Sequence, residues 1–185
     1  MNPGRKTRGR GLYLCLLVLG ALAVPTAAQA FLPPAPPTGN GPYFPMRAKA
    51  RFGDGIGASR GHEGQDLFAP AGTPELAVED AVVVDAARGD NGGRGNFVSI
   101  YSPEANRTYN YFHMLHAPVV RKGQHVIAGQ MLGELGCTGS CWGNHLHFEM
   151  RQGRDEYGPV LDPAPFLRTL VPPPPRLTPY FGAGW

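Results

Sequence analysis

Signals for helices are scarce between residues 46 and 150, and this scarcity constrains the fold more than any other feature of the chain. Runs of Val, Ile, Phe and Tyr recur there, and clusters of Gly, Asn and Asp interrupt them at short intervals. Short apolar runs between turn-forming residues are typical of β-strands joined by turns. We therefore predict a mostly β domain, built as an antiparallel sheet or a partly closed barrel-sandwich.

Six segments carry the strand pattern, and one segment near the C-terminus carries the signals of a helix. Asp162 is a favourable N-cap, and Pro163 suits the first helical position because its missing amide hydrogen has no acceptor there. We therefore predict a short terminal helix from residue 163 to residue 170. The predicted strands are residues 81–87, 97–101, 109–114, 125–127, 130–135 and 144–150.

Two histidines at alternate positions distinguish the last predicted strand. Side chains alternate between the two faces of a strand, so His145 and His147 point to one side while Leu146, Phe148 and Met150 point into a core. Two imidazoles on one face are an odd choice for a core. One of them can bind a metal while the other reaches the metal-bound water.

The same alternation puts His113 on the face of Tyr109 and Tyr111 in an earlier strand. These two tyrosines, together with Trp142 and Asn96, are candidates for the wall of a substrate groove. Packing at the rim of such a groove is the alternative interpretation of all four.

A second pair of donors lies far earlier in the chain. His62 and Asp66 occupy a glycine-flanked loop, whose folding needs neither an imidazole nor a carboxylate. Zinc bound by two His and one Asp or Glu keeps a fourth position open for water, which is the arrangement of a catalytic site. His62, Asp66 and one later histidine offer this set, with one imidazole to spare. This is the layout of a hydrolase.

The first thirty residues have the pattern of an export signal. A basic start precedes the apolar run 11–24 and a small-x-small cleavage site at residues 28–30. The run is too short to cross a bilayer comfortably, and an uncleaved N-terminal anchor is the alternative. We expect a mature protein that begins near Phe31, is secreted or acts in the cell envelope, and is a monomer without a transmembrane span.

Removal of the signal changes the charge balance. The chain has 17 Lys and Arg against 14 Asp and Glu, but four of the cations lie among the first thirty residues. The mature part is left with 13 against 14, a net charge of −1. Nucleic-acid binding needs a clustered basic face, and this composition does not indicate it.

One domain is expected between proline-rich ends. After the signal peptide at residues 1–30, a proline-rich arm is expected over 31–48, the folded domain over 49–170 and a second proline-rich tail over 171–185. Proline-rich segments favour extended conformations, so the arm and the tail are interpreted as spacers or partly ordered arms. A ligand for a proline-binding module is the alternative.

Only Cys137 and Cys141 remain after export. In an oxidising compartment, two cysteines separated by three residues can close a small loop if the local turn allows it. A disulfide is the favoured interpretation, and a zinc-binding pair is the alternative. The loop ends four residues before His145, so a disulfide stiffens the approach to the candidate site.

Three motifs stand out at residues 61–66, 111–114 and 143–149. In their order and spacing they resemble the lysostaphin/LytM-type peptidoglycan zinc metalloendopeptidases. The resemblance extends from about residue 51 to residue 167 and so covers most of the mature chain.

This resemblance implies one zinc ion bound by His62, Asp66 and His147. It also implies that His145 is the general base on the metal-bound water and that His113 hydrogen-bonds the water or the oxyanion. The expected function is hydrolysis of stem or cross-link peptides of bacterial peptidoglycan. A non-catalytic activator of other wall hydrolases, or a peptidoglycan-binding module, is the alternative. Such relatives lack part of the His/Asp set, whereas this chain keeps all five positions.

Overall fold

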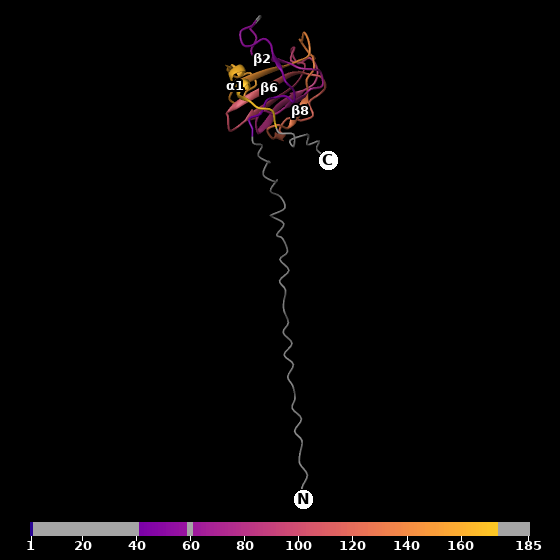
Figure 1. Cartoon of the computed structure of the whole chain (residues 1–185), viewed down its shortest axis with the longest axis vertical. Helices are drawn as coiled ribbons and strands as arrows, with labels where there is room; N and C mark the ends of the chain where they lie inside the picture. Colours follow the sequence, from indigo (N-terminus) through magenta and orange to yellow (C-terminus); the bar gives the residue numbers. More distant parts are fainter. Residues whose placement is uncertain (2–40, 59–60, 174–185) are drawn as a thin grey trace. The chain divides into compact units, whose positions relative to one another are not determined.

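A computed structural model describes residue 1, residues 41–58 and residues 61–173. The predicted signal peptide after its first residue, the first part of the proline-rich arm and most of the C-terminal tail lie outside these residues. The described strands and helix belong to one unit, Pro36–Trp185 (Figure 1). In chain order they are β1 (Arg51–Phe52), β2 (Gln65–Phe68), β3 (Pro74–Leu76), β4 (Ala81–Ala87), β5 (Asn96–Ser102), β6 (Arg107–Met114), β7 (His125–Val126), β8 (Met131–Glu134), β9 (His145–Gln152), β10 (Val160–Leu161) and α1 (Pro163–Thr169).

Antiparallel pairing of short strands builds this unit, which confirms the predicted fold class. The main sheet has the order β1-β2-β9-β6-β5-β4-β7, and β10 pairs with β9. Strands β3 and β8 form a second antiparallel pair. The six predicted strands correspond to β4 through β9. The other four, which are two to four residues long, are absent from the prediction.

Strand β9 lies inside the main sheet, between β2 and β6. Its side chains Leu146, Phe148 and Met150 are buried in the hydrophobic core, as predicted. His145 and His147 point to the opposite face, where they line a cavity. The alternation of this single strand therefore separates the core from the candidate site.

Strand β6 departs from regular alternation near its C-terminal end. Tyr109 and Tyr111 are buried in the core, whereas His113 lines the cavity on the other face of the sheet. The predicted face of His113 is therefore wrong, and the two tyrosines are core residues rather than groove residues. The cause is a β-bulge opposite the start of β5, where His113 adopts a φ of 67°. A positive φ in a residue other than glycine is strained and is typical of functional sites.

Both ends of the described domain pack on its core. Helix α1 forms as predicted, and the carboxylate of Asp162 caps it by accepting a hydrogen bond from the Ala164 amide at 2.9 Å. The side chain of Leu167 is buried in the core and attaches the helix to it. At the other end Met46, which belongs to the predicted proline-rich arm, is fully buried in the same core. The described residues include no helix that is long and apolar enough to cross a membrane.

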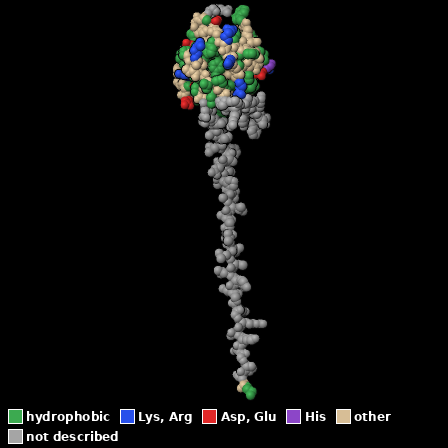
Figure 2. Space-filling view, viewed as in Figure 1, with side chains coloured by type: hydrophobic (Ala, Val, Ile, Leu, Met, Phe, Trp, Pro, Cys, Tyr) green, Lys and Arg blue, Asp and Glu red, His purple; other side chains and the backbone are tan. Residues whose placement is uncertain are grey.

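Charged side chains are mixed on the surface of the folded unit. On the face shown in Figure 2, Lys and Arg are spread among acidic and apolar side chains rather than gathered in one patch. No clustered basic face of the kind that nucleic-acid binding needs is seen in this view.

Glu75 on β3 is a buried acid without a hydrogen-bonding partner. Its side chain is fully buried, and neither carboxyl oxygen has a hydrogen-bond donor or acceptor within reach. Burial raises the pKa of Glu75 well above its usual value. The folded chain therefore holds this carboxyl protonated at pH values where the unfolded chain has lost the proton. Since the unfolded state then binds fewer protons, the free energy of unfolding falls as the pH rises above about 4.5.

We expect Glu75→Met to stabilise the domain at pH 7 by about 1–3 kcal/mol, the usual cost of an unsatisfied buried polar group. The gain is expected to shrink toward pH 4, where the unfolded carboxyl is also protonated. Urea unfolding at the two pH values measures both effects. A variant with an unchanged or lower midpoint at pH 7 would show that Glu75 is not a source of instability.

Candidate metal centre

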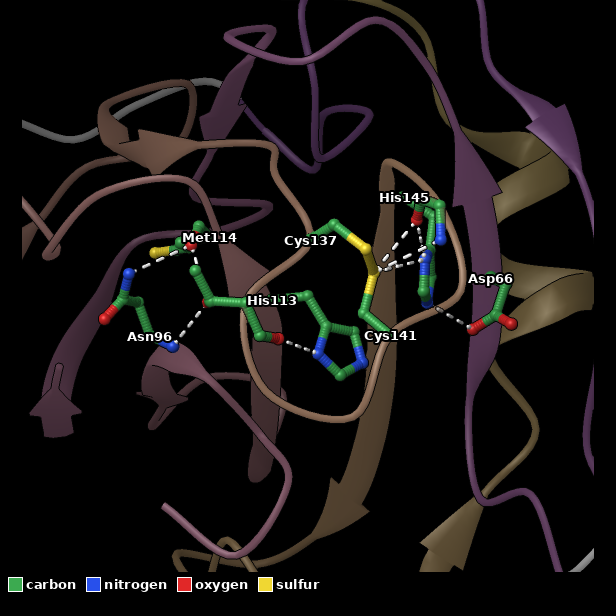
Figure 3. The surroundings of a disulfide bond; sticks show 9 residues. Asp66, Asn96, His113, Met114, Cys137, Cys141 and His145 are labelled. Atoms are coloured by element: carbon green, nitrogen blue, oxygen red, sulfur yellow. Dashed lines mark hydrogen bonds and ion pairs between the residues drawn. A yellow bond between two sulfur atoms is a disulfide. The ribbon is translucent and has the colours of Figure 1, made fainter. Parts of the chain in front are cut away.

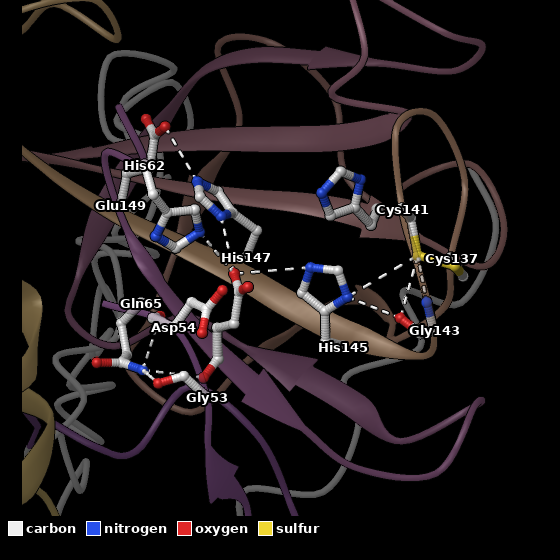
Figure 4. A network of polar contacts seen from close by, with 12 residues as sticks. Gly53, Asp54, His62, Gln65, Cys137, Cys141, Gly143, His145, His147 and Glu149 are labelled. Atoms are coloured by element: carbon white, nitrogen blue, oxygen red, sulfur yellow. Dashed lines mark hydrogen bonds and ion pairs between the residues drawn. A yellow bond between two sulfur atoms is a disulfide. The ribbon is translucent and has the colours of Figure 1, made fainter. Parts of the chain in front are cut away.

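The three predicted metal ligands meet where β2 pairs with β9. The register of this pair puts Asp66 directly opposite His147, and His62 lies in the segment just before β2. Asp66 itself lies on the strand rather than in the predicted loop. One donor atom from each of the three residues lies within 4.8 Å of the others. Figure 4 shows the imidazoles of His62 and His147 at this point, with that of His145 nearby. Cross-strand pairing therefore joins two motifs that are far apart in sequence.

Hydrogen bonds around this point direct three lone pairs toward one another. Atom Oδ1 of Asp66 is 3.0 Å from Nε2 of His62 and 3.0 Å from Nδ1 of His147. The other ring nitrogen of His62 donates to the Gly55 carbonyl at 2.9 Å, and that of His147 donates to Glu149 at 3.2 Å. These outer bonds hold the ring protons away from the centre. A carboxylate oxygen and two unprotonated nitrogens this close repel one another unless they share a cation, and two His with one Asp fit zinc.

The electrostatics of the cluster also favour a positive charge. Burial by itself raises the pKa of Asp66, but the hydrogen bond with His147 and the neighbouring histidine charges lower it overall. Burial lowers the pKa of His147, but its bonds to Asp66 and Glu149 outweigh this effect and raise the pKa to about 9. A proton between Nδ1 of His147 and Asp66 is one cation that these atoms can share at neutral pH, and a metal cation that binds there displaces it.

A buried set of polar groups supports His147 on the side away from the centre. Glu149 accepts hydrogen bonds from Nε and Nη2 of Arg151 at 3.0 and 2.7 Å. Asn110 donates to the same carboxylate at 2.7 Å, and Arg151 also binds Glu63 at 2.7 Å. Burial raises the pKa of Glu149, but its hydrogen bonds, first that with His147, lower it overall. The role of Glu149 is absent from the sequence prediction, although the alternation of β9 places it on the histidine face.

We expect Glu149→Gln to weaken zinc binding about 10- to 100-fold while the fold is kept, because carboxylates behind a ligating histidine orient it and raise its basicity. The amide keeps the shape but loses the charge that holds the His147 ring proton. Competition with a chromophoric chelator measures the affinity, and circular dichroism checks folding. Glu104→Gln, at an exposed turn, is the matched control. Equal affinities for Glu149→Gln and the unchanged protein would contradict this role.

Two further imidazoles lie beside the ligand cluster. Atom Nε2 of His145 is 3.6 Å from Oδ1 of Asp66, and its Nδ1 donates to the Gly143 carbonyl at 2.7 Å. The ring of His113 lies 4.9 Å from that of His145, between centroids, and its Nδ1 donates to the Thr138 carbonyl at 2.8 Å. Burial lowers the pKa of His113 to about 4, against the opposing effect of that carbonyl. In these tautomers each neutral ring has Nε2 free to accept a proton or a hydrogen bond.

All five predicted site residues line one open cavity of about 570 Å³. Phe112 forms part of its wall, with its ring stacked on that of His147 at 5.4 Å and an angle of 11°. Trp142, a predicted groove residue, also lines the cavity and is 89% exposed. Arg94 lies on the same wall and is absent from the prediction. A cavity of this volume suits a short stretch of peptide.

The loop between β8 and β9 borders this cavity, and Cys137 and Cys141 close it with a disulfide (Figure 3). Their Cα atoms are 5.3 Å apart. The predicted disulfide is confirmed, and the alternative of a zinc-binding cysteine pair is wrong.

Two imidazoles and a carboxylate that converge in an open groove, with two more imidazoles beside them, define the class of metal-dependent hydrolase domains. The chain belongs to peptidase family M23, and the model of this family matches residues 60–159. The resemblance inferred from the three sequence motifs is therefore confirmed.

The chain matches only part of the length of its curated relatives. Glycyl-glycine endopeptidase ALE-1 of Staphylococcus capitis is 33% identical over 108 residues, which are 58% of this chain and 29% of the relative. Peptidoglycan DD-endopeptidase ShyC of Vibrio cholerae is 40% identical over 93 residues, 50% of this chain and 21% of the relative. The match thus spans less than a third of either relative.

Solved structures show the same fold. The catalytic domain of lysostaphin from Staphylococcus simulans aligns with a TM-score of 0.58 at 30% identity, covering 64% of this chain and 92% of that domain. A zinc-containing peptidase from Vibrio cholerae aligns with a TM-score of 0.56 at 26% identity, covering 66% of this chain and 38% of that one.

Proposed function

We propose that this chain is a zinc-dependent endopeptidase that hydrolyses peptide bonds in bacterial peptidoglycan. The observation that carries the proposal is the convergence of His62, Asp66 and His147 in the groove, beside the imidazoles of His145 and His113. The substrate class is supported by the relatives, which are a glycyl-glycine endopeptidase and a peptidoglycan DD-endopeptidase.

In this proposal His62, Asp66 and His147 hold one zinc ion. When bound, zinc polarises the scissile carbonyl and lowers the pKa of a bound water to about 7. The cross-strand register of β2 and β9 and the outer hydrogen bonds of both histidines fix the ligands before the substrate arrives.

The imidazoles of His145 and His113, which lie outside the ligand set, act on the attacking water. His145 accepts the proton of the attacking water at Nε2, and the Gly143 carbonyl at Nδ1 stabilises the resulting imidazolium. The Nδ1–H group of His113 donates a hydrogen bond to the Thr138 carbonyl. In the neutral ring Nε2 therefore carries no proton and can only accept a hydrogen bond. His113 therefore orients the attacking water rather than donating to the oxyanion.

The same proposal places the protein in the cell envelope after export, with the folded domain 49–170 carrying the activity. The basic start and the apolar run 11–24 support export, and they lie outside the described residues. The family match at residues 60–159 falls inside the proposed domain.

Zinc content and hydrolysis of purified peptidoglycan, measured on residues 31–185, test the proposal. We expect about one zinc per chain. Release of soluble peptides is expected to stop on chelation and to return when zinc is added. Bound zinc without cleavage of any peptidoglycan type would favour a regulatory role in place of catalysis. Absence of zinc from the purified chain, together with failure to take it up, would refute the metal site.

A further inference from the structure

The loop closed by the Cys137–Cys141 disulfide contacts both imidazoles that lie outside the ligand set, and it contacts them through their Nδ1 atoms (Figure 3). Neither cysteine belongs to the described metal cluster. The loop, which lies between β8 and the first residue of β9, therefore contacts the two imidazoles without contributing a residue to that cluster.

On one side of the loop, Thr138 makes four hydrogen bonds around His113. Its carbonyl accepts the Nδ1 proton of His113 at 2.8 Å, and its amide donates to the His113 carbonyl at 3.3 Å. Its hydroxyl donates to the Met114 carbonyl at 2.8 Å and accepts the Asn96 amide at 2.8 Å. These bonds span the β-bulge at which His113 adopts its positive φ. Thr138 therefore fixes both the ring and the strained backbone of His113.

On the other side of the loop, the disulfide contacts the residues that hold His145. The Sγ atom of Cys141 lies 3.1 Å from the Gly143 carbonyl oxygen and 3.8 Å from Nδ1 of His145. The Gly143 carbonyl is the acceptor for that Nδ1 proton at 2.7 Å. The Sγ atom of Cys141 therefore packs against the hydrogen bond that sets the tautomer of His145.

The loop also fits closely against the glycine-rich turn at residues 92–95. The Ser140 amide donates to the Gly93 carbonyl at 2.8 Å. Gly139 has a φ of 72°, and a Cβ atom there would collide with the backbone of Gly93 and Gly95. A Cβ atom on Gly95 would collide with Thr138 in turn. The backbone path of the loop is therefore narrowly determined, and the disulfide joins its two ends.

We propose that the disulfide and Thr138 are positioning residues, which orient the imidazoles of His113 and His145 for turnover without taking part in metal binding. The inference deepens the proposed function and rests on it. A consequence is redox sensitivity. A phosphine cleaves the S–S bond to two thiols, and water supplies the two protons and the oxygen of the phosphine oxide. Reduction then slows turnover while the zinc ion stays bound.

Thr138→Val removes the hydroxyl but keeps the shape of the side chain. We expect kcat for a peptide substrate to fall about 10- to 100-fold, as for other small misplacements of catalytic groups, with KM and zinc content unchanged. Thr138→Ser restores the hydroxyl and is expected to restore kcat. Thr108→Val is the matched control, since Thr108 is fully buried and its hydroxyl donates to the Gly153 carbonyl at 2.7 Å, away from the cavity. A kcat for Thr138→Val equal to that of the unchanged protein would overturn the role of Thr138.

Reduction tests the disulfide directly. Treatment of residues 31–185 with a phosphine, until the two thiols of Cys137 and Cys141 are titrated, is expected to lower kcat to the level of the Cys137→Ser/Cys141→Ser double variant. The same treatment is expected to leave the double variant unaffected, which separates disulfide cleavage from any effect on zinc. Full activity of the completely reduced protein would overturn the proposal.

A readout independent of activity separates this inference from the proposed function. The ¹⁵N chemical shifts of the imidazoles of His113 and His145 report their tautomers in the zinc-loaded protein. We expect Nδ1 to be protonated in both rings. This preference is expected to weaken at His113 in Thr138→Val, because the carbonyl that accepts the Nδ1 proton is kept but the hydroxyl bonds that fix its position are lost, and to weaken at both rings after reduction. If the tautomers respond in this way but no peptidoglycan is cleaved, the proposed function fails and the positioning role stands. If the tautomers do not change, the positioning role fails.

Discussion

Asp66→Ala is expected to abolish both zinc retention and peptide hydrolysis. One oxygen of Asp66 is within 3.0 Å of a nitrogen of His62 and of His147, so its removal deletes the only negative charge in the ligand set. A bound metal contributes several kcal/mol to transition-state stabilisation. At about 1.4 kcal/mol per tenfold change in rate, the loss is expected to be about 10³-fold or more. His62→Ala is expected to have the same effect.

Metal analysis and peptidoglycan hydrolysis on the same preparation measure this result. Asp85→Ala is the matched control, because Asp85 lies on β4 and its carboxylate accepts only the neighbouring Ala86 amide among the described bonds. Circular dichroism verifies that both variants fold. Retention of one zinc per chain by Asp66→Ala would show that the ligand set is wrongly assigned.

His145→Ala is expected to keep the zinc ion and lose turnover. The ring of His145 lies beside the ligand cluster, with Nε2 at 3.6 Å from Asp66, and its Nδ1 is already bonded to the Gly143 carbonyl. A positioned general base contributes about 10²–10⁴-fold to the rate, and kcat is expected to fall by that factor. The contrast with Asp66→Ala, which loses the metal as well, separates a base from a ligand.

The matched control for this variant is His125→Ala, which removes an exposed imidazole on β7. Zinc stoichiometry and kcat of the two variants, measured side by side, decide the assignment. Loss of zinc from His145→Ala would mean that His145 is a ligand, and an unchanged kcat would mean that it is not the base.

The ligand set illustrates what a local sequence pattern can predict. His62 and Asp66 share one short segment, and His145 and His147 share one face of a strand, so each pair is visible in the sequence. The pairing of β2 with β9 that unites them is a long-range contact, and no local pattern specifies its register. Only the order and spacing of the three motifs, taken as a family resemblance, predict that the two halves meet.

His113 illustrates where the prediction fails. Alternation along β6 puts it on the face of Tyr111, but a bulge turns it into the cavity. The bonds that hold this bulge come from distant segments, since the His113 amide donates to Arg94 and its carbonyl accepts from Thr138. A backbone conformation that depends on two remote loops leaves no trace in the six residues of the predicted strand. For the same reason, the sequence gives no local sign of the hydrogen bonds between Thr138 and His113.

The pairing of Asp66 with His147 has a consequence for how the sheet comes apart. Strand β2 is almost at the margin, with only the two residues of β1 outside it, whereas β9 lies within the sheet. Marginal strands with few neighbours are the first to fray. A slip of β2 by one residue turns Asp66 to the opposite face, and detachment of β2 separates it from His147 altogether. A metal ion bound by these two residues links β2 to β9, so the proposed metal ligands also stabilise the edge of the sheet that is most prone to local unfolding.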